Sequence, residues 1–253
     1  MRIAALYDIH GNRWALESVL AEIEAARVDQ ILIGGDVVFG PEPRETLDRL
    51  NGLGERVRFI RGNTDRELLG PETDSDTGPW AQHRRWVAKR LTPAQHEQIA
   101  AWPETATLEL DRLGSALFCH GSPRSDEEIV TPITSEPRLR AILAGVEPKI
   151  VVHGHTHIRY DRTFDGTRLV NPGSVGMPYE VEPGAYWALL GPDVELRRST
   201  YDFARAADEI RASGFPGAED FASKNILAPP GPQETAAYFE EMAVKKEQQA
   251  GRV

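Results

Sequence analysis

The stretch VVHGHTHIRY, residues 151–160, carries three histidines on alternate positions directly after an apolar run. A hydrophobic core does not favour this pattern, because each buried imidazole needs hydrogen-bond partners for its nitrogen atoms. Neutral imidazole is the commonest nitrogen ligand of metal ions in proteins. The stretch therefore suggests a metal site to which His153, His155 or His157 contributes, provided that other parts of the chain supply further ligands.

The composition sets broad limits on the function. With 253 residues, 40% of them hydrophobic, the chain can form one large domain or two small ones. The net charge of -10 argues against a broad surface for nucleic acid or anionic membrane, but it is compatible with a phosphate-bearing substrate held by metal ions. A single cysteine, Cys119, is typical of a reducing compartment, and no apolar run approaches the ~18 residues of a membrane span. We therefore expect a cytoplasmic protein.

Short apolar runs alternate with helical patterns along the chain, which is typical of an α/β fold. A helix is predicted over residues 13–26 from the spacing of its apolar positions. Five predicted strands end in glycine and polar residues, and their sequences are RIAALYD, QILIGGD, VRFIRGN, ALFCHGS and IVVHGHTH. Open α/β sheets bind ligands beyond the carboxyl ends of their strands, so we expect these five endings to meet at one site.

The remaining segments predict a helical insertion, a hairpin and a helical extension. Two helical stretches fall within residues 66–103, and the second begins with a capping box formed by Thr92 and Gln95. The runs AYWALL and VELRRSTY, on either side of GPD, predict a closing hairpin over residues 185–201. Residues 214–232 are interpreted as a connector between two helices, the second of which begins near residue 234.

The strand endings contain a set of metal-binding side chains. The seven candidates are Asp8, His10, Asp36, Asn63, His120, His155 and His157. Seven donors are too many for one tetrahedral ion, but they suit two divalent ions that share a bridging carboxylate. The mixture of carboxylate, amide and imidazole favours manganese, with iron and zinc as alternatives, over calcium or copper(I).

The motifs at these endings resemble a known family. DIHGN, the GD within GGDVVFGP, GNTD, HGS and GHTH resemble, in order, the five blocks of the calcineurin-like metallophosphoesterases, and especially the small bacterial and archaeal phosphodiesterase branch. NPGSVGMP, residues 171–178, resembles the block that follows the last metal motif in that branch. The resemblance covers roughly residues 1–200. It implies a four-layer α/β/β/α sandwich of two mixed β-sheets in residues 1–200. The helical insertion and the helical extension expected over residues 201–253 lie outside what the resemblance implies.

The resemblance also implies a role for each ligand. It assigns Asp8, His10 and His157 to the first metal and Asn63, His120 and His155 to the second, with Asp36 as the bridge. Asp36, Asn63 and His120 are the residues we expect to matter most for catalysis. The implied reaction is hydrolysis of a small phosphoester, in which the two metals lower the pKa of a water molecule that attacks phosphorus.

Several of these residues have a simpler interpretation when each is taken alone. Asp8 and His10 could cap a helix, and Asp36 and Asn63 are common turn residues. Five such coincidences at one end of a sheet are improbable, so the metal hypothesis is preferred for the set. His153 has no metal role in the family pattern, and we expect it to be a packed histidine or one that supports the ligands.

Arginines that neighbour the motifs are candidates for binding the substrate phosphate. Arg61, Arg124 and Arg159 neighbour the motifs and could bind phosphate, and Arg124 is retained as the substrate-binding candidate because it follows HGSP directly. Cys119 is expected to be a packed apolar residue.

One residue departs from the wider family and sharpens the functional hypothesis. Many relatives read GNHD or GNHE, where the histidine protonates the leaving group, whereas this chain has Thr64. Threonine cannot act as a general acid at neutral pH. This counts against two alternatives, a dinucleoside polyphosphate hydrolase and a protein phosphatase, because those relatives usually carry the histidine. A third alternative is a non-catalytic scaffold with the same fold, like the retromer subunit; the sequence leaves the oligomeric state open.

Overall fold

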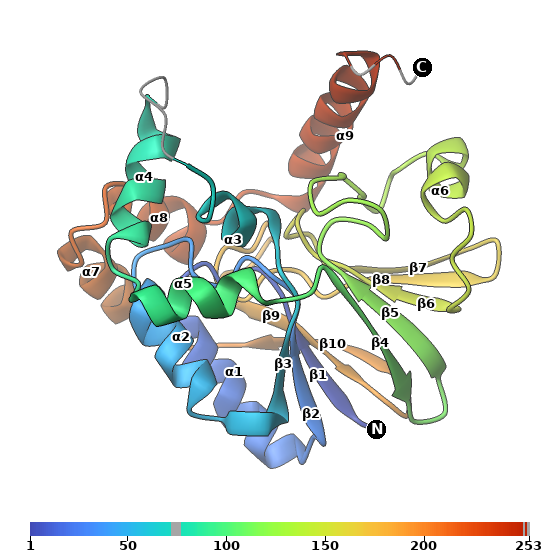
Figure 1. The fold of residues 1–253 in the computed structure, drawn as a ribbon, viewed down its shortest axis with the longest axis horizontal. Helices are drawn as coiled ribbons and strands as arrows, with labels where there is room; N and C mark the ends of the chain where they lie inside the picture. Colours follow the sequence, from blue (N-terminus) through green and yellow to red (C-terminus); the bar gives the residue numbers. More distant parts are fainter. Residues whose placement is uncertain (72–76, 250, 252–253) are drawn as a thin grey trace.

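Two mixed five-stranded sheets form the centre of the molecule in the computed structural model, which describes residues 1–71, 77–249 and 251 (Figure 1). Sheet 1 has the order β10-β9-β1-β2-β3 and sheet 2 the order β4-β5-β6-β8-β7. The strands of sheet 1 are β1 (Ile3–Leu6), β2 (Gln30–Ile33), β3 (Val57–Phe59), β9 (Ala185–Leu190) and β10 (Val194–Ser199). Those of sheet 2 are β4 (Thr105–Leu110), β5 (Gly114–Cys119), β6 (Ile150–Val152), β7 (Tyr160–Phe164) and β8 (Thr167–Asn171).

The predicted ligands follow strands that pair in parallel. In sheet 1, β1 pairs in parallel with β2, and β2 with β3, while the predicted β9–β10 hairpin is antiparallel and is confirmed. In sheet 2, β5 pairs in parallel with β6. Because parallel strands end at the same edge of a sheet, the endings of β1, β2 and β3 meet in one sheet and those of β5 and β6 in the other.

Side-chain alternation along the strands creates separate cores on the two faces of each sheet. Ile3 and Ala5 of β1 pack against Phe118 and Val152 of sheet 2, whereas Leu6 packs against helices on the opposite face of sheet 1. On the outer face of sheet 2, helix α6 (Glu136–Ile142) packs its apolar side chains against the sheet. The molecule is therefore an α/β/β/α sandwich, as the resemblance implied (Figure 1).

The helices of the N-terminal half cover the outer face of sheet 1 and lie near the edge where its strands end. They are α1 (Arg13–Ala26), α2 (Pro43–Asn51), the short 3₁₀ turn η1 (Gly54–Arg56), α3 (Asn63–Glu67), α4 (Pro79–Ala88) and α5 (Pro93–Ala100). α1 has the predicted bounds, and its N-cap is Asn12, whose side chain accepts from the Ala15 N–H. The predicted capping box of α5 is present, since Thr92 and Gln95 bond each other's backbone N–H groups.

The C-terminal part contains α7 (Phe203–Ala212), α8 (Ala218–Phe221), a π-helical turn η2 (Ala222–Leu227) and α9 (Pro232–Gln249). The interpretation of residues 214–232 as a plain connector was wrong, because Phe221 and Ile226 are buried in the core that covers sheet 1 and therefore fold this segment as helix. α9 projects from the edge of the molecule where the ligand-bearing strands end (Figure 1). No helix in the described ranges is long and apolar enough to cross a membrane.

Candidate metal centre

The predicted ligands share an unusual backbone conformation. Among the described residues with positive φ that are not glycine, five are predicted ligands: Asp8 (55°), His10 (48°), Asp36 (53°), His155 (68°) and His157 (57°). Side chains other than glycine, asparagine and aspartate rarely adopt this left-handed region, and residues that do so cluster at functional sites. The strand endings are therefore shaped to direct carboxylates and imidazoles inward, rather than to form ordinary turns.

Asp8 lies at the centre of the cluster. Its Oδ1 atom is 3.4 Å from His157 Nε2, 3.8 Å from His120 Nε2 and 3.9 Å from His10 Nε2. This oxygen is buried and has no hydrogen-bond partner in the described part of the chain, while Oδ2 accepts from the His155 N–H at 3.0 Å. An unpartnered buried carboxylate oxygen is costly, so Oδ1 is suited to binding a cation.

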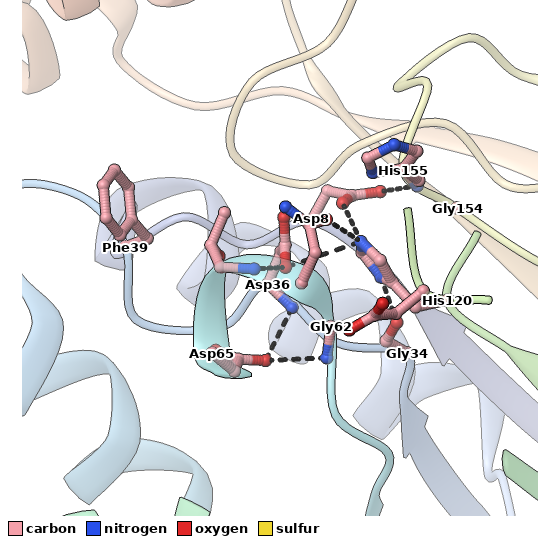
Figure 2. Close-up of polar contacts among 12 residues, drawn as sticks. Asp8, Gly34, Asp36, Phe39, Gly62, Asp65, His120, Gly154 and His155 are labelled. Atoms are coloured by element: carbon pink, nitrogen blue, oxygen red, sulfur yellow. Dashed lines mark hydrogen bonds and ion pairs between the residues drawn. The ribbon is translucent and has the colours of Figure 1, made fainter. Parts of the chain in front are cut away.

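Asp36 faces two histidines with its two oxygens. Oδ2 is 3.8 Å from His10 Nε2. Oδ1 is 3.4 Å from His120 Nε2 (Figure 2). These are the two histidines that the resemblance assigns to different metals, so the arrangement is compatible with a bridging carboxylate. The Thr64 N–H donates to Oδ1 at 2.9 Å and holds the side chain in this orientation.

Among the carboxylates and histidines that the structure describes, two groups of donor atoms are compact enough to hold an ion. One consists of Asp8, His10 and His157, which are the residues predicted for the first metal. The other consists of Asp8, Asp36 and His120; in each group the donor atoms lie within 4.8 Å of one another. Asp8 belongs to both groups, a feature that the sequence did not indicate.

Backbone carbonyl groups fix the tautomers of three histidines. The Nδ1 atoms of His10, His120 and His157 lie 3.1, 2.8 and 2.7 Å from the carbonyl oxygens of Phe39, Gly34 and Met177, respectively. A carbonyl oxygen only accepts, so each Nδ1 carries a proton, and in the neutral ring Nε2 presents a lone pair. His10 Nε2 and His157 Nε2 are 3.2 Å apart, and two facing lone pairs repel unless a cation lies between them. The donors therefore fit a metal ion.

The ionisation of the site is consistent with the same conclusion. Burial lowers the pKa of His10 to about 4 and that of His155 to about 3, so both rings are neutral and can bind metal. Burial acts in the same direction on His120, but Asp36 and Asp8 raise its pKa to about 10. His120 must therefore release a proton when it binds a metal. Burial raises the pKa values of Asp8 and Asp36, but the surrounding histidines lower both below the usual value, so both are carboxylates.

Asn63 and His155 are less closely held than the other candidates. Asn63 Oδ1 lies 3.1 Å from His120 Nε2, which brings the amide to the second donor group. The rings of His155 and His120 are in edge-to-face contact, with centroids 5.3 Å apart, but neither compact donor group contains a nitrogen of His155. The assignment of His155 as a ligand stays a prediction.

His153 lies apart from the other two histidines of its stretch. Its Nε2 atom is 2.6 Å from the Tyr160 hydroxyl oxygen, and the two rings are in edge-to-face contact. Tyr160 belongs to the core on the outer face of sheet 2, together with Val151. This position agrees with the prediction that His153 is a packed histidine rather than a ligand.

Asp65 is a site residue that the sequence analysis missed. Its carboxylate accepts from the N–H groups of Asp36 (2.8 Å), Val37 (3.0 Å) and Gly62 (3.1 Å), and so connects the endings of β2 and β3 (Figure 2). Burial, followed by the neighbouring Asp36 carboxylate, raises the pKa of Asp65 to about 7, while the N–H donors favour its charged form. GNTD contains this aspartate, but only the folded loops reveal its three donors.

The motif glycines allow the loops to approach the carboxylates. A Cβ atom on Gly62 would lie 2.2 Å from Asp36 Oδ1, and a Cβ on Gly154 would lie 2.6 Å from Asp8 Oδ2. Both contacts are far shorter than non-bonded atoms tolerate. The glycines of GNTD and GHTH are therefore steric requirements of the site.

The three arginines considered for phosphate binding are engaged elsewhere. Arg124 forms bonds with Glu128 and with the carbonyl of Ala141, and it lines a surface pocket beside α6 and α9 that none of the seven candidate ligands lines. Arg61 contacts Glu104, and Arg159 contacts Glu180. The substrate-binding role of Arg124 stays a prediction, and this geometry does not support it.

Comparison with known proteins agrees with the fold and the site. The family model described as the calcineurin-like phosphoesterase superfamily domain matches residues 1–191. Phosphodiesterase YfcE of Escherichia coli is 27% identical over 203 residues, covering 77% of this chain and 89% of the relative. An uncharacterised protein of Methanocaldococcus jannaschii is 25% identical over 237 residues, covering 85% of this chain and 93% of the relative.

A solved structure is similar over nearly the whole chain. The crystal structure of a metallophosphoesterase from Sphaerobacter thermophilus superposes with a TM-score of 0.71 at 26% sequence identity, covering 90% of this chain and 98% of the other. The family model also spans all the strand endings that form the donor cluster. The chain therefore belongs to the calcineurin-like phosphoesterase superfamily.

Proposed function

We propose that this protein is a phosphodiesterase that works with two divalent metal ions, manganese by preference, with iron and zinc as the alternatives. Asp8, His10 and His157 would hold one ion; Asn63, His120 and His155 would hold the other; Asp36 would bridge them. The observation that carries the proposal is the set of imidazole Nε2 atoms that converge on Asp8 Oδ1, with their Nδ1 atoms bonded to backbone carbonyls.

The residues of the chain prepare the centre for a phosphate ester. When bound, the two ions act as Lewis acids and make a water molecule nucleophilic near neutral pH. Asp8 and Asp36 neutralise only part of the charge of two divalent ions, so the loaded centre is positive and attracts an anionic ester in an otherwise acidic protein. The Thr64 N–H holds Asp36, and Asp65 holds the backbone of the same loop.

The position that carries a histidine acid in many relatives is occupied by Thr64 in this chain. The Thr64 hydroxyl is buried, with no hydrogen-bond partner in the described part of the chain. Two histidines lie outside the ligand-bearing stretches, and both are engaged elsewhere: His83 packs its ring against Phe215, and His96 Nε2 is 3.0 Å from the Ala88 carbonyl. Esters with good leaving groups, such as aryl phosphodiesters, should therefore react faster than alkyl monoesters.

A metal-reconstituted activity screen tests the proposal. The purified chain, stripped of metal and reloaded with manganese, would be assayed on aryl phosphodiesters, phosphomonoesters, cyclic nucleotides and a dinucleoside tetraphosphate. We expect the aryl diesters to be hydrolysed fastest and the activity to disappear when metal is removed. Preference for a monoester or for the tetraphosphate, or full activity without metal, would contradict the proposal.

A further inference from the structure

A row of aromatic rings leads from a candidate metal ligand to the C-terminal helix. The ring of His157 stacks on Tyr179, with centroids 4.9 Å apart and an angle of 23° between the planes. The Tyr179 N–H also donates to the His157 carbonyl at 3.1 Å. Tyr179 also contacts Phe239 of α9, with ring centroids 6.1 Å apart. α9 lies outside residues 1–191, so the family domain does not account for this contact.

Two carboxylates of helix α9 anchor it beside the site. Glu240 accepts from the hydroxyls of Thr131 (2.7 Å) and Thr134 (2.5 Å) and from the guanidinium of Arg138 (2.6 Å). Arg138 also donates to Glu247, seven residues further along α9, at 2.8 Å. Thr131 and Thr134 are buried, so these are partly desolvated, charge-assisted bonds rather than a loose surface pair. The helix backbone at Phe239, the residue before Glu240, is therefore anchored next to the site.

We propose that Phe239 and Tyr179 form an aromatic wall that binds a flat, apolar group attached to the phosphate of the substrate, which makes Phe239 a specificity-determining residue. The proposal rests on the proposed phosphodiesterase function. Tyr179 and Phe239 are both partly buried, and the adjacent Tyr238 is 61% exposed. Aromatic rings stack on any flat group without demanding a particular hydrogen-bond pattern.

The wall and Thr64 favour the same substrates for independent reasons. A centre without a histidine acid works best on esters whose leaving group is stable when unprotonated, and aryl oxides are such groups. An aromatic wall next to a metal ligand increases the affinity for esters of this class. The part of the binding energy that Phe239 supplies comes from α9, so it is separable from the metal chemistry.

Direct binding of two phosphonates to the manganese-loaded protein tests the wall without turnover. Phenylphosphonate and methylphosphonate present the same anionic group to the metals, and they differ in the flat ring. Isothermal titration calorimetry should give the wild type about 10-fold tighter binding of phenylphosphonate. Phe239→Ala should remove this preference while leaving the affinity for methylphosphonate and the metal content unchanged, and Glu240→Gln should weaken the preference by loosening α9.

Val244→Ala provides the matched control, since Val244 is an exposed apolar residue on the same helix, 42% accessible, and should leave the preference intact. A Phe239→Ala protein that retains the preference would overturn the wall. Equal weakening of both phosphonates would also overturn it, since Phe239 would then act only by supporting His157. Failure of the loaded wild type to bind either phosphonate would overturn the proposed function itself, and the wall with it.

Discussion

The two ends of the β-strands use the same left-handed backbone conformation for different purposes. At the hairpin end, Arg112 (φ 61°) and Asp165 (φ 47°) lie in exposed turns that join neighbouring antiparallel strands. At the other end, Asp8 (φ 55°) and Asp36 (φ 53°) are buried, and the chain continues away from its strand. A tight hairpin requires the left-handed conformation at Arg112 and Asp165. No such turn requires it at Asp8 and Asp36, so the site itself explains the conformation there.

Hydrogen bonds between loops hold the buried pair in place. The N–H of Asp8 donates to the Gly35 carbonyl at 3.1 Å, and the N–H of His10 donates to the Asp36 carbonyl at 2.9 Å. The endings of β1 and β2 therefore fix each other's backbone, and each turns its side chain toward the other. Backbone strain at this end is the means by which donors from separate strands are brought together.

The largest expected effect comes from comparing one aspartate at each end of the strands. Asp36→Asn keeps the shape of the side chain but removes the charge that faces His10 and His120, so turnover of an aryl diester should fall by about 10³-fold. Asp165→Asn changes the same residue type in the same backbone conformation at the hairpin end, and its activity should stay near that of the wild type. Steady-state kinetics with both variants provide the measurement. Normal turnover by Asp36→Asn would refute the bridging role.

A second prediction divides the histidines of residues 153–157. His157→Ala removes a donor next to Asp8 and should weaken metal binding by about 10²-fold, and His155→Ala should also lose metal. His153→Ala should retain most of the metal, because its Nε2 bonds the Tyr160 hydroxyl instead. Metal content after dialysis, measured by plasma mass spectrometry, distinguishes these cases. Equal loss in the three variants would show that the division is wrong.

A third prediction concerns Asp65, which bonds to backbone N–H groups of both loops. Asp65→Asn places an amide NH₂ group against N–H donors, so the endings of β2 and β3 should separate and activity should fall by about 10-fold. Thermal unfolding should show a lower Tm as well, because buried donors lose their acceptor. Asp161→Asn, a change in an exposed aspartate paired with Arg168, is the control. Unchanged kinetics and Tm in Asp65→Asn would contradict the supporting role.

The smallest expected effect tests the absence of a histidine acid. Thr64→His should speed the poorest leaving groups by about 3-fold, well below the ~10²- to 10⁴-fold of an evolved general acid, and should barely affect aryl esters. A series of phosphodiesters with increasing leaving-group pKa, assayed with wild type and variant, gives the two slopes. A shallow slope in the wild type would mean that another residue already supplies the proton, and His83 and His96 would be the first to mutate.

Local patterns predicted several individual elements well, whereas the four layers were implied by the family resemblance. The apolar spacing of α1, the capping box at Thr92 and the hairpin at residues 191–193 are each determined by a few neighbouring residues. Strands β4, β7 and β8 and helices α2 and α6 were not predicted. The mixed burial of β4 and β7 arises from their positions at the edges of sheet 2, which a single sequence does not reveal.

Five of the seven candidate ligands lie together as predicted, but the geometry of the cluster was not predicted. Motif spacing indicated which side chains would meet, and Asp8, His10, Asp36, His120 and His157 do meet. The shared position of Asp8 could not be predicted, because it depends on the relative orientation of two sheets. The wall formed by Phe239 was equally hidden, because Phe239 and Tyr179 are 60 positions apart in the sequence. Their contact depends on Glu240, which bonds Thr131 in a distant part of the chain.

The central claim is that the inward-facing side chains at the strand endings form a two-metal centre. The metal stoichiometry of the reloaded protein tests this claim most directly. The stripped chain would be reloaded with manganese, dialysed and measured by plasma mass spectrometry together with its turnover of an aryl phosphodiester. We expect two manganese ions per chain and activity that rises with their binding. A chain that hydrolyses the ester while holding no tightly bound metal would contradict the account.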